Sequence, residues 1–161
     1  MTPPPKGTSV LLEARSIIAM ITPQPPHIPV IVLELEDGRE FALYNVPYEV
    51  VRALNMLESG EELPDLARGS IFDILAVLRD LVRDLGNKLE QVVIDEIDYN
   101  TYLYTAKASF NLGGIYMVKR MIPSHAIFLA KLFGKPVYVS QKLVDEQEEL
   151  GRRMREEEED F

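Results

Sequence analysis

The chain reads VIVLELEDGREFALYNVPYEV at residues 30–50, and the pattern of this stretch returns as YLYTAKASFNLGGIYMVKRMIPSHA at residues 102–126, about 76 positions later. Each copy has two strand-like segments joined by a turn, at Glu36 to Gly38 and at Asn111 to Gly114. A helix follows near a proline in both copies. Asp-Gly is a strong hairpin signal, and proline is favoured in a first helical turn, where its missing N–H is not needed. The sequence therefore predicts an α+β fold, a single domain with internally duplicated β-hairpin–helix units and a mainly antiparallel sheet.

Further elements surround the two copies. We expect strands over residues 9–21, 89–97 and 136–139, and a loop in the proline-rich stretch 22–29. Ser70 and Asp73 form a capping-box pattern, which opens a helix that Gly86 closes. The apolar face of this expected helix has helical spacing and consists of Ile71, Ile74, Leu75, Leu78, Val82 and Leu85. We expect a disordered N-terminus over residues 1–8, the duplicated domain over 9–144, and a C-terminal helix with an acidic tail over 145–161.

The composition limits the class of protein. A chain of 161 residues with 47% hydrophobic residues is long enough to bury a substantial core. No apolar run is long enough to cross a bilayer, and the N-terminus does not resemble a signal peptide. The absence of cysteine excludes disulfides and thiolate metal sites. We therefore expect a cytoplasmic protein that does not enter a membrane.

Charge is distributed unevenly along the chain. The net charge is −9, yet residues 99–144 contain six bases and no acid, which gives this segment a net charge of +6. Two interpretations remain open. The basic segment either pairs with acidic surface, in its own chain or in a neighbouring subunit, or it provides a site for an anion such as a phosphate.

The two helix starts place Glu49 and His125 at corresponding positions. A carboxylate is favoured in a first helical turn whatever its function, and an imidazolium is disfavoured there, so His125 should remain neutral. A neutral imidazole can accept a proton or bind a metal. Asp73 can serve purely as the capping residue of Ser70. Each of these residues thus has a structural interpretation beside a catalytic one.

Three segments resemble the bifunctional nuclease domain family, a small α+β module named for RNase and DNase activity. They are residues 92–106, which end in Asn-Thr-Tyr-Leu-Tyr-Thr-Ala, residues 123–139, with Pro-Ser-His-Ala and Pro-Val-Tyr-Val, and residues 41–49. The order and spacing of the segments match the family over about residues 12–144. The resemblance implies a nuclease that acts on RNA or DNA phosphodiesters, with Mg²⁺ or Mn²⁺ as the metal.

The departures from the family pattern fall on polar positions. The family has Asp after Pro-Ser, where this chain has His125, and Arg before that proline, where this chain has Ile122. Lys119 and Arg120 lie nearby as substitutes for the arginine. The His-Asp pair that opens the family's middle helix is here Phe72-Asp73.

Hydrolysis of a phosphodiester generally needs a metal held by carboxylates, an activated water and a cation. The candidate catalytic residues are Glu49, Asp73 and His125, of which Glu49 and Asp73 are also the candidate metal ligands. Lys119 and Arg120 are the candidate phosphate-binding residues. Because the polar positions have changed, we expect nuclease activity to be weak or lost.

The alternative function is a non-catalytic oligomeric module that binds nucleic acid, a protein or an anionic ligand. We expect a homo-oligomer, a dimer, that uses strand edges in residues 99–118. The chain has tyrosines at 102, 104, 116 and 138 among its bases, a composition that is also found on surfaces that stack nucleobases. Strand alternation favours a core or subunit-interface position for these rings.

Overall fold

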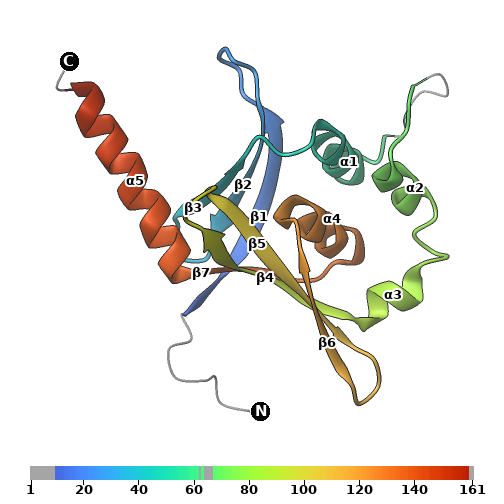
Figure 1. Ribbon diagram of the computed structural model, residues 1–161. Coiled ribbons are helices and arrows are strands. Elements are labelled where there is room, and N and C mark those ends of the chain that lie inside the picture. Colours follow the sequence, from blue (N-terminus) through green and yellow to red (C-terminus); the bar gives the residue numbers. More distant parts are fainter. Residues whose placement is uncertain (1–9, 62, 64–66, 160–161) are drawn as a thin grey trace.

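The computed structural model describes residues 10–61, 63 and 67–159 (Figure 1). The expected disorder of residues 1–8 lies outside the described residues. The elements are β1 (Leu11–Ile21), β2 (Pro29–Leu35), β3 (Glu40–Tyr44), α1 (Tyr48–Ser59), α2 (Ile71–Val77), α3 (Arg83–Lys88), β4 (Leu89–Asp98), β5 (Leu103–Asn111), β6 (Tyr116–Met121), α4 (Pro123–Phe133), β7 (Val137–Ser140) and α5 (Gln141–Glu159).

The sheet confirms the predicted α+β class and the internal duplication. Its seven strands run in the order β3-β2-β1-β7-β4-β5-β6. The first three strands and β4 to β6 therefore form two similar meanders on either side of β7. Only the β4–β7 pair is parallel, and the other five pairs of neighbouring strands are antiparallel.

Each meander leads into a helix at the predicted proline. Pro47 is the N-cap of α1, and Pro123 is the first residue of α4. Both helices end at a glycine with left-handed backbone, Gly60 and Gly134, the residue that this conformation favours. Figure 1 shows α1 and α4 side by side on one face of the sheet, where they bury the central core.

The sheet curls until strands from its two halves meet. The rings of Phe41 on β3 and Tyr104 on β5 pack edge to face, with centroids 4.9 Å apart. The helix α5 lies on the opposite side of the molecule from α1 and α4 (Figure 1) and contacts β3, β4 and β7. The curl brings the end of β3 and the start of β5 to the same part of the surface.

Residues 71–86 differ from the predicted single helix. They form the short helices α2 and α3, joined by turns at residues 78–82. The predicted capping box of Ser70 and Asp73 is present. The predicted apolar face is mostly exposed, however, because Phe72 and Asp73 turn toward the protein instead; Ile71 and Ile74 are 64% and 54% exposed.

Gly86 lies inside α3 and does not close a helix. A Cβ at this position would lie 2.2 Å from Cδ1 of the Phe133 ring, far inside van der Waals contact. Glycine therefore allows α3 to approach α4 closely. The sequence predicted a helix end here because glycine is common at that position. The packing of Phe133 against Gly86 cannot be seen from the sequence pattern.

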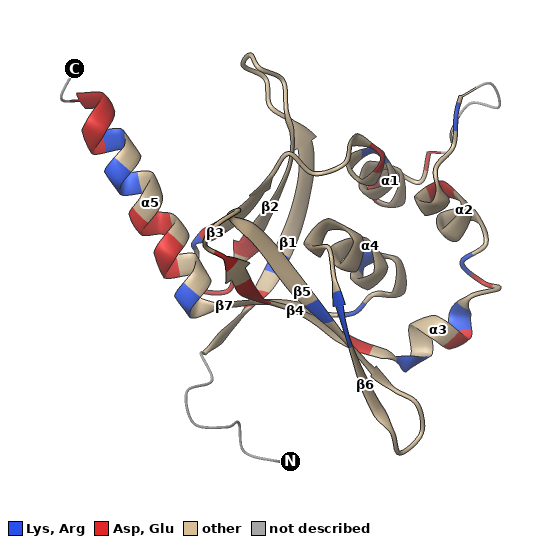
Figure 2. Ribbon diagram, in the orientation of Figure 1, with Lys and Arg blue, Asp and Glu red and all other residues tan. Residues whose placement is uncertain are grey.

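Acidic and basic side chains alternate along α5, and basic residues gather on β5 and β6 (Figure 2). No helix within the described part of the chain has both the length and the apolar character needed to cross a bilayer.

Candidate functional site

Asp73, one of the predicted catalytic residues, is buried, and one of its two carboxylate oxygens is engaged in local structure, whereas Oδ1 has no hydrogen-bond partner among the described residues. Its Oδ2 accepts hydrogen bonds from the Arg52 guanidinium at 2.9 Å and from the main-chain N–H of Ser70 at 2.6 Å. The Ser70 hydroxyl lies 3.2 Å from the same oxygen. Asp73 thus caps α2 and ties it to α1 through an ion pair with Arg52.

His125 packs against aromatic rings in the first turn of α4. Its ring meets Phe72 of α2 edge to face, with centroids 5.0 Å apart, and Phe72 contacts Phe128 in the same way at 5.1 Å. Burial lowers the pKa of His125 below its usual value of 6.5. The imidazole therefore stays neutral at pH 7 and joins α4 to α2 as an aromatic ring.

Glu49 is exposed in the first turn of α1. The described residues contain no group of three His, Asp or Glu side chains placed to hold one metal ion. The three predicted catalytic residues lie on three helices of the same part of the molecule, Glu49 on α1, Asp73 on α2 and His125 on α4.

The predicted phosphate-binding residues Lys119 and Arg120 lie exposed on β6, on opposite faces of the strand. Arg120 forms an ion pair with Glu96 at 2.7 Å. Lys107 pairs with Asp95 and Glu96 at 3.1 Å in each case. Part of the basic segment is thus neutralised by acids of the same chain.

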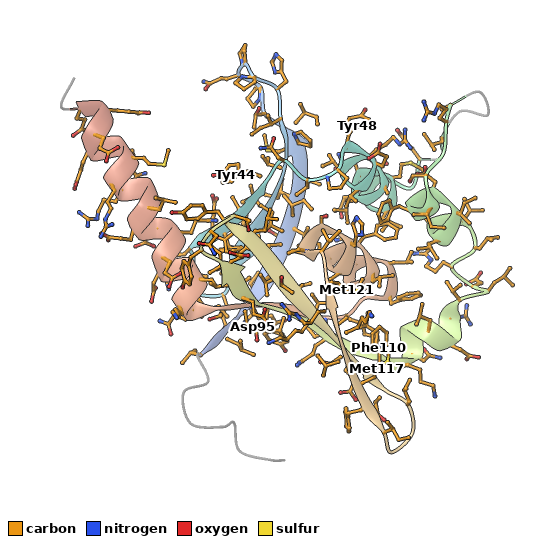
Figure 3. The ribbon with its side chains drawn as sticks, viewed as in Figure 1. Tyr44, Tyr48, Asp95, Phe110, Met117 and Met121 are labelled. Carbon is orange, nitrogen blue, oxygen red and sulfur yellow. The ribbon has the colours of Figure 1, made fainter. Side chains whose placement is uncertain are left out.

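A surface hollow of about 350 Å³ lies where the curled sheet brings the two halves together. Its walls come from the segment between β3 and α1, the start of β5, and the segment between β6 and α4. They consist of Leu43, Tyr44, Asn45, Val46, Pro47, Tyr102, Leu103, Tyr104, Ile122, Pro123 and Ser124. Figure 3 shows Tyr44 on this side of the molecule, with Tyr48 near the start of α1. The lining is mainly apolar and aromatic and contains no charged side chain.

Two features of this hollow are unusual for a structural surface. Asn45 and Tyr102 both have left-handed backbone, with φ of 55° and 58°, and such strain in residues other than glycine concentrates at functional sites. Ser124 is 2% exposed, and its Oγ has no hydrogen-bond partner among the described residues. A buried hydroxyl is normally satisfied; the enclosed Ser124 hydroxyl shares this property with four other side-chain atoms, Ser16 Oγ, Arg52 Nε, Asp73 Oδ1 and Asp95 Oδ1.

A second hollow of about 510 Å³ adjoins the first and shares Tyr102 and Tyr104 with it. Its other lining residues are Ile97, Tyr99, Asp145, Glu146, Gln147, Glu149, Leu150 and Arg153. The two hollows together are named the tyrosine groove below. One end of the tyrosine groove is apolar, and the other end, along α5, carries three carboxylates and one guanidinium.

Tyr99 and Tyr104 keep their protons. The Tyr99 hydroxyl donates to Glu146 Oε1 at 2.9 Å, and this hydrogen bond raises the pKa of Tyr99. Burial raises the pKa of Tyr104. Both phenols are therefore neutral hydrogen-bonding groups at pH 7.

Sequence reasoning predicted a core or subunit-interface position for Tyr102 and Tyr104 but did not bring Tyr44, Asn45 and Ser124 to the same place. The sequence feature that could have located this hollow is the duplication, since Asn45-Val46-Pro47 and Met121-Ile122-Pro123 are corresponding segments before the two helices.

Neither the protein-family models nor the curated proteins with which the sequence was compared gave a match, so the resemblance to the bifunctional nuclease domain stays a prediction.

Proposed function

We propose that this protein is a non-catalytic binding module whose tyrosine groove docks an extended protein segment carrying both apolar and basic side chains. The observation that carries the proposal is the continuity of an apolar hollow and an acidic hollow across Tyr102 and Tyr104. Tyrosine is enriched at protein interfaces because one side chain offers a large apolar area and a polar tip.

The chemistry of the groove defines the ligand. The apolar end takes a hydrophobic side chain. At the other end Glu146, which forms no ion pair within the described residues, favours lysine or arginine, whereas Glu149 is already paired with Arg152 and Arg153. The same carboxylates disfavour a nucleic acid backbone, whose phosphates bind to basic surfaces.

The surroundings of the predicted catalytic residues support a binding function over hydrolysis. Oδ2 of Asp73 is already bound by Arg52 and the Ser70 cap, and the described residues contain no group of three His, Asp or Glu side chains placed to hold a metal ion. Arg120, one of the two candidate phosphate-binding residues, forms an ion pair with Glu96.

Selection of short random peptides displayed on phage tests the proposal. On the wild-type protein we expect enrichment of peptides that combine large apolar residues with lysine or arginine. The variant Tyr102→Ser should lose binding of the enriched peptides at least tenfold, because each well-packed aromatic anchor contributes about 2 kcal/mol. Tyr116→Ser is the matched control, since Tyr116 is similarly exposed but lies on β6 (66% against 63%), and it should bind as the wild type does.

Two results would contradict the proposal. One is a selection that enriches nothing or enriches acidic peptides. The other is turnover of single-stranded RNA or DNA with Mg²⁺ or Mn²⁺ by the purified protein that disappears in Glu49→Ala, because that result would restore the hydrolytic function.

A further inference from the structure

The two edges of the sheet differ in how they are closed. At the β3 edge, the Gln147 side chain of α5 accepts the Ala42 N–H at 2.8 Å and donates to the Ala42 carbonyl at 2.9 Å. The amide of Gln147 thereby takes the place of a neighbouring strand. Arg39, just before β3, is bound to α5 through Asp145 at 2.7 Å, so this edge is covered.

The β6 edge has no such cover among the described residues, and every residue from Tyr116 to Arg120 is exposed. Ile115, Tyr116 and Val118 are exposed by 70%, 66% and 57%. Figure 3 shows Met117 near the hairpin end of β6 and Met121 at the end beside α4. An edge strand with this much apolar surface is a template for another strand.

The hydrogen-bonding phase of the hairpin shows which main-chain groups are available. The β5–β6 hairpin closes with a bond from the Leu112 N–H to the Ile115 carbonyl at 2.8 Å. Hydrogen-bonded positions alternate along an antiparallel pair, so the main-chain groups of Tyr116, Val118 and Arg120 face away from β5. These three residues offer their N–H and carbonyl groups to a partner strand.

We propose that β6 pairs antiparallel with β6 of a second copy, with Val118 on the two-fold axis, so that the two sheets become continuous. This register places Tyr116 opposite Arg120 of the second copy, a favourable cross-strand pair of an aromatic ring and a cation. It also places Met117 opposite Lys119. Registers centred on Lys119 or Arg120 would instead oppose identical cations, which is destabilising.

The dimer extends beyond the function proposed for the tyrosine groove and rests on different residues. The main-chain groups of β6 carry the pairing, whereas the groove is lined by β5, α5 and the helix starts. Failure of either proposal therefore leaves the other unaffected.

Light scattering coupled to size exclusion at micromolar concentrations tests the association. The wild-type chain should have twice the monomer mass of 18.3 kDa. Val118→Lys should give a folded monomer, because two cations would meet at the axis. Val77→Lys is the matched control: Val77 is also exposed, by 71%, but lies on α2, and this variant should remain dimeric. A monomeric wild type, or a dimer that Val77→Lys disrupts and Val118→Lys does not, would overturn the proposal.

Cysteine cross-linking tests the register, and the chain contains no cysteine of its own. In the proposed register the two Val118 Cα atoms lie about 5.5 Å apart, within the range that a disulfide spans. Mild oxidation of Val118→Cys should therefore link most of the protein into dimers. Tyr116→Cys, at a position that is at least as exposed (66% against 57%), would lie about 14 Å from its counterpart and should link poorly. Equal linking at both positions, or none at Val118→Cys, would refute the register.

Discussion

The close approach of α3 to α4 at Gly86 gives a stability prediction with a defined magnitude. In Gly86→Ala the new Cβ would meet three atoms of the Phe133 ring at 2.2, 2.6 and 2.7 Å. Relief of such overpacking costs up to about 3 kcal/mol. Alanine recovers about 1 kcal/mol of helix propensity relative to glycine, so we expect a net loss of about 2 kcal/mol in the free energy of unfolding.

Urea denaturation and thermal melting measure this loss. For a chain of this length 1 kcal/mol corresponds to a Tm shift of about 2–4 °C, so Gly86→Ala should melt about 4–8 °C lower. Gly151→Ala in α5 is the matched control, because nothing lies within 4 Å of its Cβ position. This control should melt at the wild-type temperature or slightly above.

A double-mutant cycle identifies the cause. Phe133→Leu in the Gly86→Ala background removes the ring that the methyl group meets. The double mutant should therefore lose less stability than the sum of the losses in the two single mutants. If Gly86→Ala is as stable as the wild type, or if the losses simply add, the close packing of α3 on α4 is not the reason for glycine at this position.

Three further predictions concern the contacts around the predicted site residues. Arg52→Ala should lower the free energy of unfolding in urea by about 2 kcal/mol, because the buried Asp73 carboxylate loses the guanidinium at 2.9 Å; a variant as stable as the wild type would contradict this. NMR titration should place the pKa of His125 below 6.5. As the pH falls, the unfolded chain takes up a proton on His125 before the folded chain does. The contribution of His125 to stability is therefore full above pH 6.5 and falls as the pH drops toward its folded-state pKa. A measured pKa at or above 6.5 would show that burial does not lower it. Gln147→Ala removes both hydrogen bonds to Ala42 and should lower the free energy of unfolding by about 1–2 kcal/mol. The Ala42 amide should exchange its hydrogen faster, and unchanged exchange would show that the β3 edge is covered in another way.

The sequence was sufficient for the elements that depend on local signals. Alternating apolar residues and glycine turns predicted the strands of both meanders, and Pro47 and Pro123 marked the helix starts. These predictions were correct because turn chemistry and strand periodicity depend on only a few neighbouring residues. The pattern in residues 89–97 likewise predicted β4.

The remaining features depend on contacts between distant parts of the chain. The close approach of Gly86 to Phe133 and the ion pair of Arg52 with Asp73 hold residues 71–86 against neighbouring helices, and neither has a local signal. The curl that joins Phe41 to Tyr104 creates the tyrosine groove, and strand alternation alone cannot show it. Helical spacing therefore gave an apolar face that the structure leaves exposed.

An NMR map of the tyrosine groove provides the decisive measurement of the proposed function. The peptide enriched most strongly by the wild-type protein is titrated into isotope-labelled protein, and the amide shift of each residue is followed. We expect saturable shifts centred on Tyr102, Tyr104 and Ser124, continuing along α5 to Glu149. Shifts centred instead on Glu49 and His125, or shifts that do not saturate, would contradict the assignment of the groove as the binding site.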